Sequence, residues 1–278
     1  MEWRGEMTEP ATSAQGPAEA SVVPRDLLVE GTGHRLGRCS AALGSDGGAN
    51  LFSGVFVRYR DRPFVLTAAH CLAAIRNWRS LRLISGNLRL AQRPPPLRKA
   101  RGCKDDGPFD IAFLELEPQF AASLGADWIE QAQMHSRGLK AGLTVCLRGS
   151  PAERAARVSE RPVGVSRRDV VFETHVVDPP ALAIDPPVHE VDLFMEFDPD
   201  RVRDLLTGKP VAPPSPKGMS GGGVFALRKP SPDELWNPQL HVQLVGIQSA
   251  VLGGRAHCLR AKKIELALSM LEDYCEGR

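Results

Sequence analysis

A serine, a histidine and an aspartate in this sequence have the chemistry of an acyl-transfer site. The serine is Ser220, in the glycine-rich stretch "KGMSGGG". A serine hydroxyl attacks a carbonyl when a base removes its proton, and the oxygen that becomes negative needs main-chain N–H donors. The flanking glycines let the backbone turn tightly and approach a substrate closely. Taken alone, a Gly-x-Ser-x-Gly stretch is also typical of a simple turn.

The candidate base is His70, in "FVLTAAHCLA", where it follows an apolar, strand-like run. On its own it could equally be a core histidine or a metal ligand. The candidate partner of this histidine is Asp110, at the start of the apolar stretch "FDIAFLELE". A carboxylate there is costly to bury unless it is paired, and an imidazole N–H would be a suitable partner. The alternative is an ordinary aspartate at the start of a strand.

Short strands must hold these side chains, and the sequence predicts many of them. In "SGVFVRYRDRPFVLTAAH" apolar residues alternate on either side of a turn at residues 60–63, which indicates a β-hairpin. A second hairpin is predicted around a turn at 85–87. Further strands are predicted at 109–117, 143–149, 161–177, 189–197 and 241–251. Helical spacing is visible only in "KKIELALSMLEDYCEG" at the end of the chain, so we predict an all-β fold with a C-terminal helix.

The charge and hydropathy of the chain argue against nucleic-acid binding and membrane insertion. With 35 basic and 33 acidic residues among 278, the net charge of +2 gives no electrostatic reason to expect nucleic acid or an anionic membrane as a partner. No apolar run approaches the roughly 18–20 residues that span a bilayer. Residues 1–27 have no apolar core, so we predict a disordered leader and not a secretory signal.

The six cysteines are widely spaced and contain no Cys-x-x-Cys. Without an export signal, this pattern predicts reduced thiols in a cytoplasmic protein, and no metal or other cofactor. A zinc site is the alternative interpretation of these cysteines.

In the order His70, Asp110, Ser220, the stretches "LTAAHC", "DIAFL" and "GMSGGG" resemble the trypsin/chymotrypsin-like serine peptidase family. The resemblance extends over roughly residues 50 to 275, because "GIQSAV" (246–251) and the closing helix fall where that family has its substrate-aligning strand and its C-terminal helix. It implies two six-stranded antiparallel barrels packed face to face. The barrels would span 28–125, with the histidine and aspartate, and 126–256, with the serine; the final strand and helix would span 257–278.

The same resemblance implies the roles of the residues. The protein would be a serine endopeptidase that hydrolyses polypeptides through an acyl-enzyme. The N–H groups of Gly218 and Ser220 would form the oxyanion hole. The residues that line the substrate site would be Pro214, Lys217, Ser249, Ala250 and Val251. No carboxylate is evident among them, so cleavage after Lys or Arg is disfavoured and a small apolar or acidic side chain is expected.

The sequence also departs from the digestive members of the family. Met219 stands where zymogen-activated members have an aspartate, and no Ile-Val-Gly-Gly start is present. The "GMSGG" form is similar to bacterial and organelle members that need no such activation. No cysteine stands at 54–56 to pair with Cys71, so we expect a free thiol, with Cys39 as the alternative partner. An intracellular protease of this kind needs restraint, which suggests a restricted protein substrate and a regulatory protein partner.

Two other interpretations stay open. One is a catalytically silent scaffold or binding module with a trypsin-like fold. The other takes Gly218 to Gly222 as the nucleophile elbow of an α/β-hydrolase, which would require a helix directly after the serine.

Overall fold

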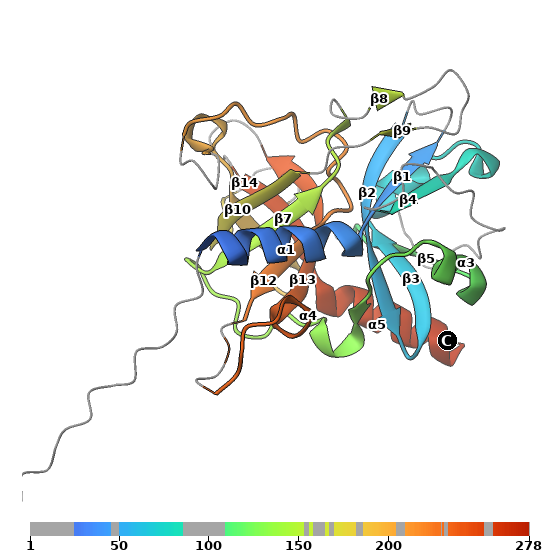
Figure 1. Ribbon diagram of the computed structural model, residues 1–278. Coiled ribbons are helices and arrows are strands. Elements are labelled where there is room, and N and C mark those ends of the chain that lie inside the picture. The colour runs from blue at the N-terminus through green and yellow to red at the C-terminus, as the bar shows by residue number, and fades with distance from the viewer. Residues whose placement is uncertain are drawn as a thin grey trace, which may run out of the picture.

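Strands make up most of the chain, as the alternating apolar residues predict. The computed structural model (Figure 1) describes residues 25–45, 50–85, 109–152, 156–157, 165–166, 170–181, 186–203, 209–228, 230, 233–252 and 258–277. Most of the predicted leader (1–24), the strand predicted after the turn at 85–87, and Cys103 lie outside the described residues.

The first sheet has six strands in the order β4-β1-β2-β3-β5, with β6 beside β2. Their bounds are β1 (Ser40–Ser45), β2 (Asn50–Tyr59), β3 (Arg62–Thr67), β4 (Arg82–Ser85), β5 (Ala112–Glu115) and β6 (Ile129–Glu130). The predicted hairpin is confirmed: β2 and β3 pair antiparallel through Tyr59 and Arg62. Its two turn residues, Arg60 and Asp61, have φ of 48° and 61°, which matches the twist of the strands they join.

Six later strands close into a barrel in the order β10-β11-β14-β13-β12-β7. Their bounds are β7 (Thr144–Gly149), β10 (Val170–Val177), β11 (Asp192–Glu196), β12 (Gly223–Leu227), β13 (Val242–Leu252) and β14 (Cys258–Lys263). A separate two-stranded ribbon consists of β8 (Ala156–Arg157) and β9 (Val165–Ser166). The α/β-hydrolase interpretation fails here, because strand β12, and not a helix, follows Ser220.

A closed six-stranded second barrel is therefore confirmed, although it includes β14, which lies beyond the predicted bound at residue 256. The first six strands differ from the predicted barrel. Among the described residues they form a sheet that does not close, because its edge strands β4 and β5 do not pair with each other. A barrel needs continuous pairing around its circumference.

The helices are α1 (Arg25–Cys39), α2 (Ala69–Ala73), α3 (Pro118–Ser123), α4 (Pro238–His241) and α5 (Ile264–Glu276), with short 3-10 turns η2 (Trp78–Ser80), η3 (Gln131–Gln133) and η5 (Pro199–Arg201). The predicted C-terminal helix α5 is confirmed and ends at Gly277, whose φ of 75° is the left-handed conformation favoured after a helix. The sequence did not predict α1. It contains three glycines, which are poor helix formers, so contacts with the rest of the molecule must stabilise it.

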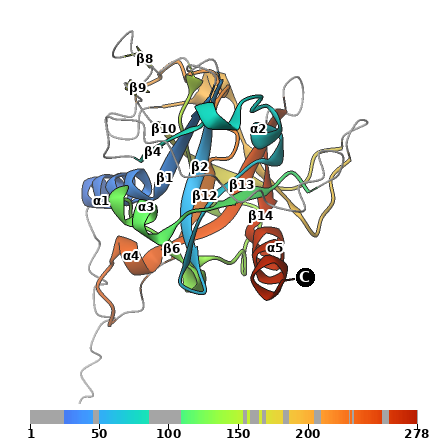
Figure 2. The same ribbon diagram turned by 90° about the vertical axis from the view of Figure 1, so that its right-hand side faces the viewer.

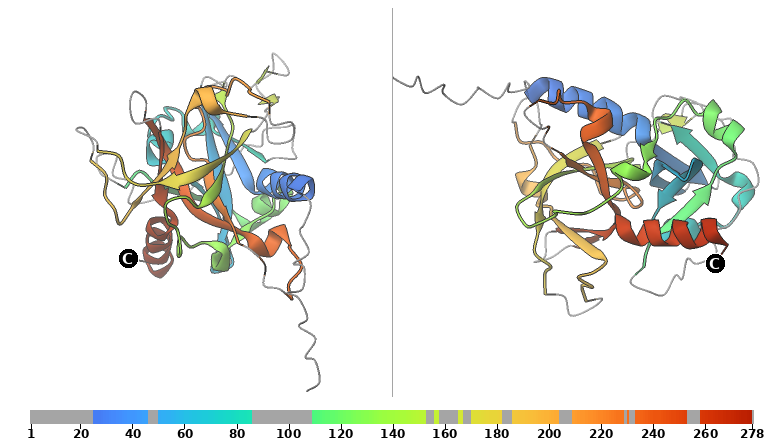
Figure 3. Two further views of the ribbon diagram at one scale, coloured as in Figure 1. Left: turned by 90° about the vertical axis from the view of Figure 1, so that its left-hand side faces the viewer. Right: turned by 90° about the horizontal axis from the view of Figure 1, so that it is seen from below.

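A shared apolar core joins the sheet to the barrel. It includes Val57 of β2, Phe64 of β3, Phe225 of β12, Leu244 of β13 and Ile264 of α5, all fully buried. Figure 3 shows α1 and α5 on opposite sides of the molecule, each reaching from the barrel to the first sheet. Figure 2 shows α5 nearly end-on below β14.

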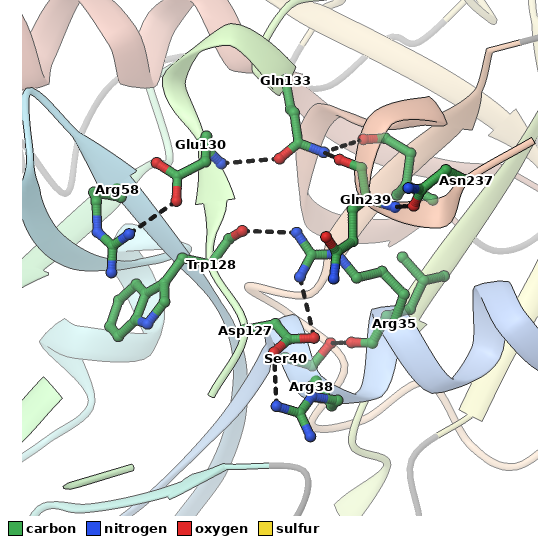
Figure 4. Close-up of polar contacts among 12 residues, drawn as sticks. Arg35, Arg38, Ser40, Arg58, Asp127, Trp128, Glu130, Gln133, Asn237 and Gln239 are labelled. Atoms are coloured by element: carbon green, nitrogen blue, oxygen red, sulfur yellow. Dashed lines mark hydrogen bonds and ion pairs between the residues drawn. The ribbon is translucent and has the colours of Figure 1, made fainter. Parts of the chain in front are cut away.

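An ion-pair cluster fixes α1 to the segment that connects the sheet to the barrel (Figure 4). Arg35 bonds the main-chain oxygen of Trp128 at 2.8 Å and pairs with Asp127 at 3.1 Å. Arg38 pairs with the same carboxylate at 2.8 Å. Burial works to raise the pKa of Asp127, but its bonds to the two arginines hold the pKa below the usual value. No helix in the described part of the chain is long and apolar enough to cross a membrane.

We predict that Asp127→Asn destabilises the fold by about 2–4 kcal/mol at neutral pH, because it leaves the buried Arg35 guanidinium without its charge partner. Since the folded-state pKa of Asp127 is depressed, this stabilisation is present above the unfolded value near 4 and disappears as the pH falls through the folded value. Urea unfolding at several pH values measures it.

Glu130→Gln is the control. Glu130 lies in the same segment as Asp127 and pairs with Arg58 of β2, but both of these side chains are more than one-third exposed. It should cost less than about 1 kcal/mol. Equal losses for the two variants would contradict the account of the cluster.

Candidate active site

Strand pairing brings His70 and Asp110 to the same end of the first sheet. Strands β3 and β5 pair antiparallel with Thr67 opposite Ala112. His70 lies three residues after Thr67, in the first turn of α2, and Asp110 lies two residues before Ala112. Residues 40 positions apart in the sequence thereby become neighbours.

The Asp110 carboxylate holds His70 by two hydrogen bonds. One oxygen accepts from the His70 main-chain N–H at 2.9 Å, and the other lies 2.7 Å from Nδ1 of the ring. The bond to Asp110 is the main cause that raises the pKa of His70 from 6.5 to about 10, and the neighbouring Cys71 adds to it. Burial works to raise the pKa of Asp110, but these bonds to His70 hold it below the usual value. The two side chains therefore form an ion pair whenever the ring is protonated, and half of the His70 side chain is exposed.

Two glycines of "KGMSGGG" are required by the backbone geometry around Ser220. Gly218 has φ of 91°, and a Cβ there would lie 2.8 Å from the Ala152 nitrogen. Gly221 has φ of 87°, and a Cβ there would lie 2.1 Å from Thr67 Oγ1. Both positions therefore exclude a side chain on two independent grounds. At Gly221, the loop of the barrel touches the first sheet three residues before His70.

Main-chain hydrogen bonds fix the loop on both sides. Ser220 accepts at its carbonyl oxygen from the N–H of Ser53 in β2 at 3.0 Å. Gly221 donates to the carbonyl of Gln248 in β13, and Gln248 donates to the carbonyl of Gly222, both at 2.8 Å. The loop is thus held between the first sheet and the barrel.

The third member of the predicted triad lies next to the other two but is not bonded to them. Among the described residues, no hydrogen bond joins the Ser220 hydroxyl to His70. The Nε2 atom of His70 instead lies 3.6 Å from Cys71 Sγ, and this thiol lies 3.5 Å from the Ser220 carbonyl oxygen. Catalytic hydrogen bonds in unliganded sites are often long and tighten when substrate binds.

The predicted oxyanion donors are two main-chain N–H groups that can each donate a hydrogen bond to a ligand. Within the described part of the chain, the main-chain N–H groups of Gly218 and Ser220 have no acceptor, whereas their neighbours Met219 and Gly221 donate to main-chain carbonyls. Two unused N–H donors around a serine are what a developing oxyanion requires.

The predicted substrate-binding residues lie in three places and do not line one common cavity. Pro214 is buried and lines a cavity of about 620 Å³ between β10 and residues 196–203. Ser249, Ala250 and Val251 lie on β13, where Ser249 donates to the Arg260 carbonyl at 3.2 Å, and they do not line that cavity. Lys217 is exposed in the loop before Gly218.

The sequence did not identify Ser53, which is buried in β2 and contacts the Ser220 loop. Its only signal is a serine within the apolar alternation of "NLFSGVFVRY".

All the described cysteines, including Cys71, are unpaired. They are buried except for Cys275, which is partly exposed. No three His, Cys, Asp or Glu side chains gather as a metal site in the described ranges.

Comparisons with known proteins identify the family and the fold. The family model described as Trypsin matches residues 30–172, a stretch that contains His70 and Asp110 and ends before Ser220. The chain is similar to an inactive serine-to-alanine variant of Rv3671c from Mycobacterium tuberculosis, with 13% identity and a TM-score of 0.50, covering 89% of this chain and 92% of that one. It is also similar to the HtrA-type protease AlgW solved with a tripeptide, with 16% identity and a TM-score of 0.53, covering 88% of this chain and 62% of AlgW. No curated protein sequence matches the chain.

We predict that His70 titrates well above 6.5 in an NMR pH titration and that Asp110→Asn returns its pKa toward 6.5, because the raised value depends on the carboxylate. Since the folded-state pKa is raised, the pair contributes its full stability below pH 6.5, and the contribution is lost as the pH rises toward 10. A wild-type ring that titrates at 6.5 or below would contradict the ion pair.

Gly221→Ala should destabilise the protein by about 3 kcal/mol or more, because the cost of a positive φ adds to the cost of a steric clash with Thr67. Gly142→Ala is the matched control: its φ of 83° is similar but a Cβ there meets nothing within 4 Å. The control should lose only about 1–2 kcal/mol. Urea unfolding of both variants tests the difference, and equal losses would refute the contact.

Proposed function

Because the chain belongs to the trypsin family, we propose that it is a serine endopeptidase whose triad is Ser220, His70 and Asp110. The observation that carries the proposal is the pair of hydrogen bonds by which Asp110 holds His70 beside the Ser220 loop. The imidazole is oriented with Nδ1 toward the carboxylate, which leaves Nε2 as the atom that can take the serine proton.

The proposed reaction begins from the neutral form of the His70 ring, which the raised pKa makes the minor form at neutral pH. This ring accepts the hydroxyl proton as Ser220 Oγ attacks a peptide carbonyl. The carbonyl oxygen becomes negative and accepts hydrogen bonds from the N–H groups of Gly218 and Ser220. The protonated ring then gives its proton to the leaving amine, and an acyl-enzyme remains. Water attacks this ester with the same base, so that Ser220 regains its proton and the carboxylic acid leaves.

The proposed substrate is a polypeptide with a small apolar or acidic side chain before the cleaved bond. Support comes from Ser249, Ala250 and Val251 of β13, which offer no carboxylate to a basic side chain. Pro214 gives no such support, because the cavity that it lines also contains Glu173, Glu196 and Asp198. Met219 is buried in the apolar core of the barrel, so a new N-terminus would find no carboxylate there. Activation by N-terminal cleavage is therefore not part of the proposal.

We infer further that the protease is intracellular, acts on a restricted protein substrate and responds to a regulatory protein partner. The buried, unpaired thiols of Cys39, Cys71 and Cys146 fit a reducing compartment. Ser220, which has no bond to His70 in the described residues, fits a resting state that substrate or partner converts.

The absence of a hydrogen bond between Ser220 and His70 in the described residues also favours a second candidate function, a silent scaffold that binds proteins without cleaving them. The two candidates differ in whether Ser220 reacts.

We predict that a fluorophosphonate probe labels the wild-type protein, that Ser220→Ala abolishes labelling, and that the wild type hydrolyses peptides at least about 10³-fold faster than this variant. A peptide set that varies the residue before the cleaved bond gives the specificity from the same assay. A wild-type protein that is folded, unlabelled and inactive would favour the scaffold, and a strong preference for Arg would place the specificity site elsewhere.

A further inference from the structure

Ser53 is a polar residue in an otherwise apolar position. In β2, alternation puts it on the same face as Leu51, Val55 and Val57, which are all buried, and Ser53 itself is only 1% exposed. A buried hydroxyl without partners would cost about 1–3 kcal/mol, so its partners explain why it is tolerated there.

Four hydrogen bonds converge on this one residue. Its Oγ donates to the Gly218 carbonyl at 2.8 Å and accepts from the Ser150 N–H at 2.8 Å. Its main-chain N–H donates to the Ser220 carbonyl at 3.0 Å, and its carbonyl accepts from Thr67 Oγ1 at 2.7 Å. Ser53 therefore contacts both residues whose N–H groups are the proposed oxyanion donors, and also the strand that leads to His70.

We propose that the Ser53 hydroxyl is a positioning device for the oxyanion donors, an inference that rests on the proposed peptidase function. Gly218 has φ of 91° and Gly221 has φ of 87°, and glycine reaches many other backbone conformations as readily, so contacts from outside help to select this one. Anchoring the Gly218 carbonyl through the side chain fixes the Gly218–Met219 peptide plane, and anchoring the Ser220 carbonyl through the main chain fixes the Ser220–Gly221 plane. The free N–H groups of Gly218 and Ser220 belong to the peptide planes that directly precede these two, so their directions depend on how the anchored planes are held.

Close packing around Ser53 leaves little room for water to replace the hydroxyl. A Cβ on Gly149 would lie 3.1 Å from Ser53 Oγ, and a Cβ on Gly221 would lie 2.2 Å from the Ser53 carbonyl oxygen. Ser53→Ala therefore removes the only described partner of the Gly218 carbonyl, while the main-chain bonds to Ser220 and Thr67 persist. The variant should fold with a loosened loop.

The test compares Ser53→Ala with Ser85→Ala, a matched control in the same sheet. Ser85 is also 1% exposed and donates to a main-chain carbonyl, that of Leu124, at 2.8 Å, but it does not contact the Ser220 loop. For both variants we would measure kcat and KM for a peptide substrate, the unfolding midpoint, and the affinity for a peptide aldehyde, whose hemiacetal oxygen takes the oxyanion position.

We expect Ser53→Ala to lower kcat by about 10–100-fold with little change in KM, and to weaken aldehyde binding by the same factor, because a small misplacement of a catalytic group has effects of this size. Ser85→Ala removes one such bond where Ser53→Ala removes two, so it should lower the unfolding midpoint less and leave kcat unchanged.

A Ser53→Ala variant with kcat within about twofold of the wild type would overturn the inference. So would parallel losses of kcat in both variants, which would indicate a structural role alone. A wild type that neither hydrolyses peptides nor labels at Ser220 would instead remove the proposed function, and the inference with it.

Discussion

The whole site depends on one contact, the close approach of the Ser220 loop to the edge of the first sheet. Gly221 lies so near Thr67 and Ser53 that no side chain fits, and the hydrogen bond from Ser53 to Ser220 fixes the distance. The loop belongs to the barrel, whereas His70 and Asp110 belong to the sheet, so neither half holds all three residues of the proposed triad. The shared core and the two bridging helices, α1 and α5, serve to keep this contact closed.

The charges of the two halves also meet at the site. Asp110 is held by His70 from the sheet, and Lys262 of β14 helps to keep the pKa of this carboxyl low. Lys262 in turn bonds the buried Asp192 at 2.6 Å, which Arg260 also bonds. Burial raises the pKa of Asp192 and these two cations hold it below the usual value. Buried charges are costly unless they are paired, so removing Asp192 would leave both cations without their charge partner.

Local patterns predicted much of this molecule and long-range contacts decided the rest. Alternating apolar residues gave the β2–β3 hairpin and most barrel strands, and helical spacing gave α5, because these signals lie within one segment. Helix α1 was missed because its glycines argue against a helix, and it is stabilised by Asp127 and Trp128, about 90 residues away. Ser53 was missed for the same reason: its partner Gly218 is 165 residues distant, and a lone serine in a strand carries no sign of that contact.

The most direct test of this account is a crystal structure of the protein with a peptide boronic acid. It predicts a bond from boron to Ser220 Oγ, one boron-bound oxygen within hydrogen-bond distance of the Gly218 and Ser220 N–H groups, His70 Nε2 turned toward the adduct, and Ser53 Oγ still on the Gly218 carbonyl. A boronate that leaves Ser220 unmodified, or an adduct whose oxygens contact neither of these N–H groups, would contradict it.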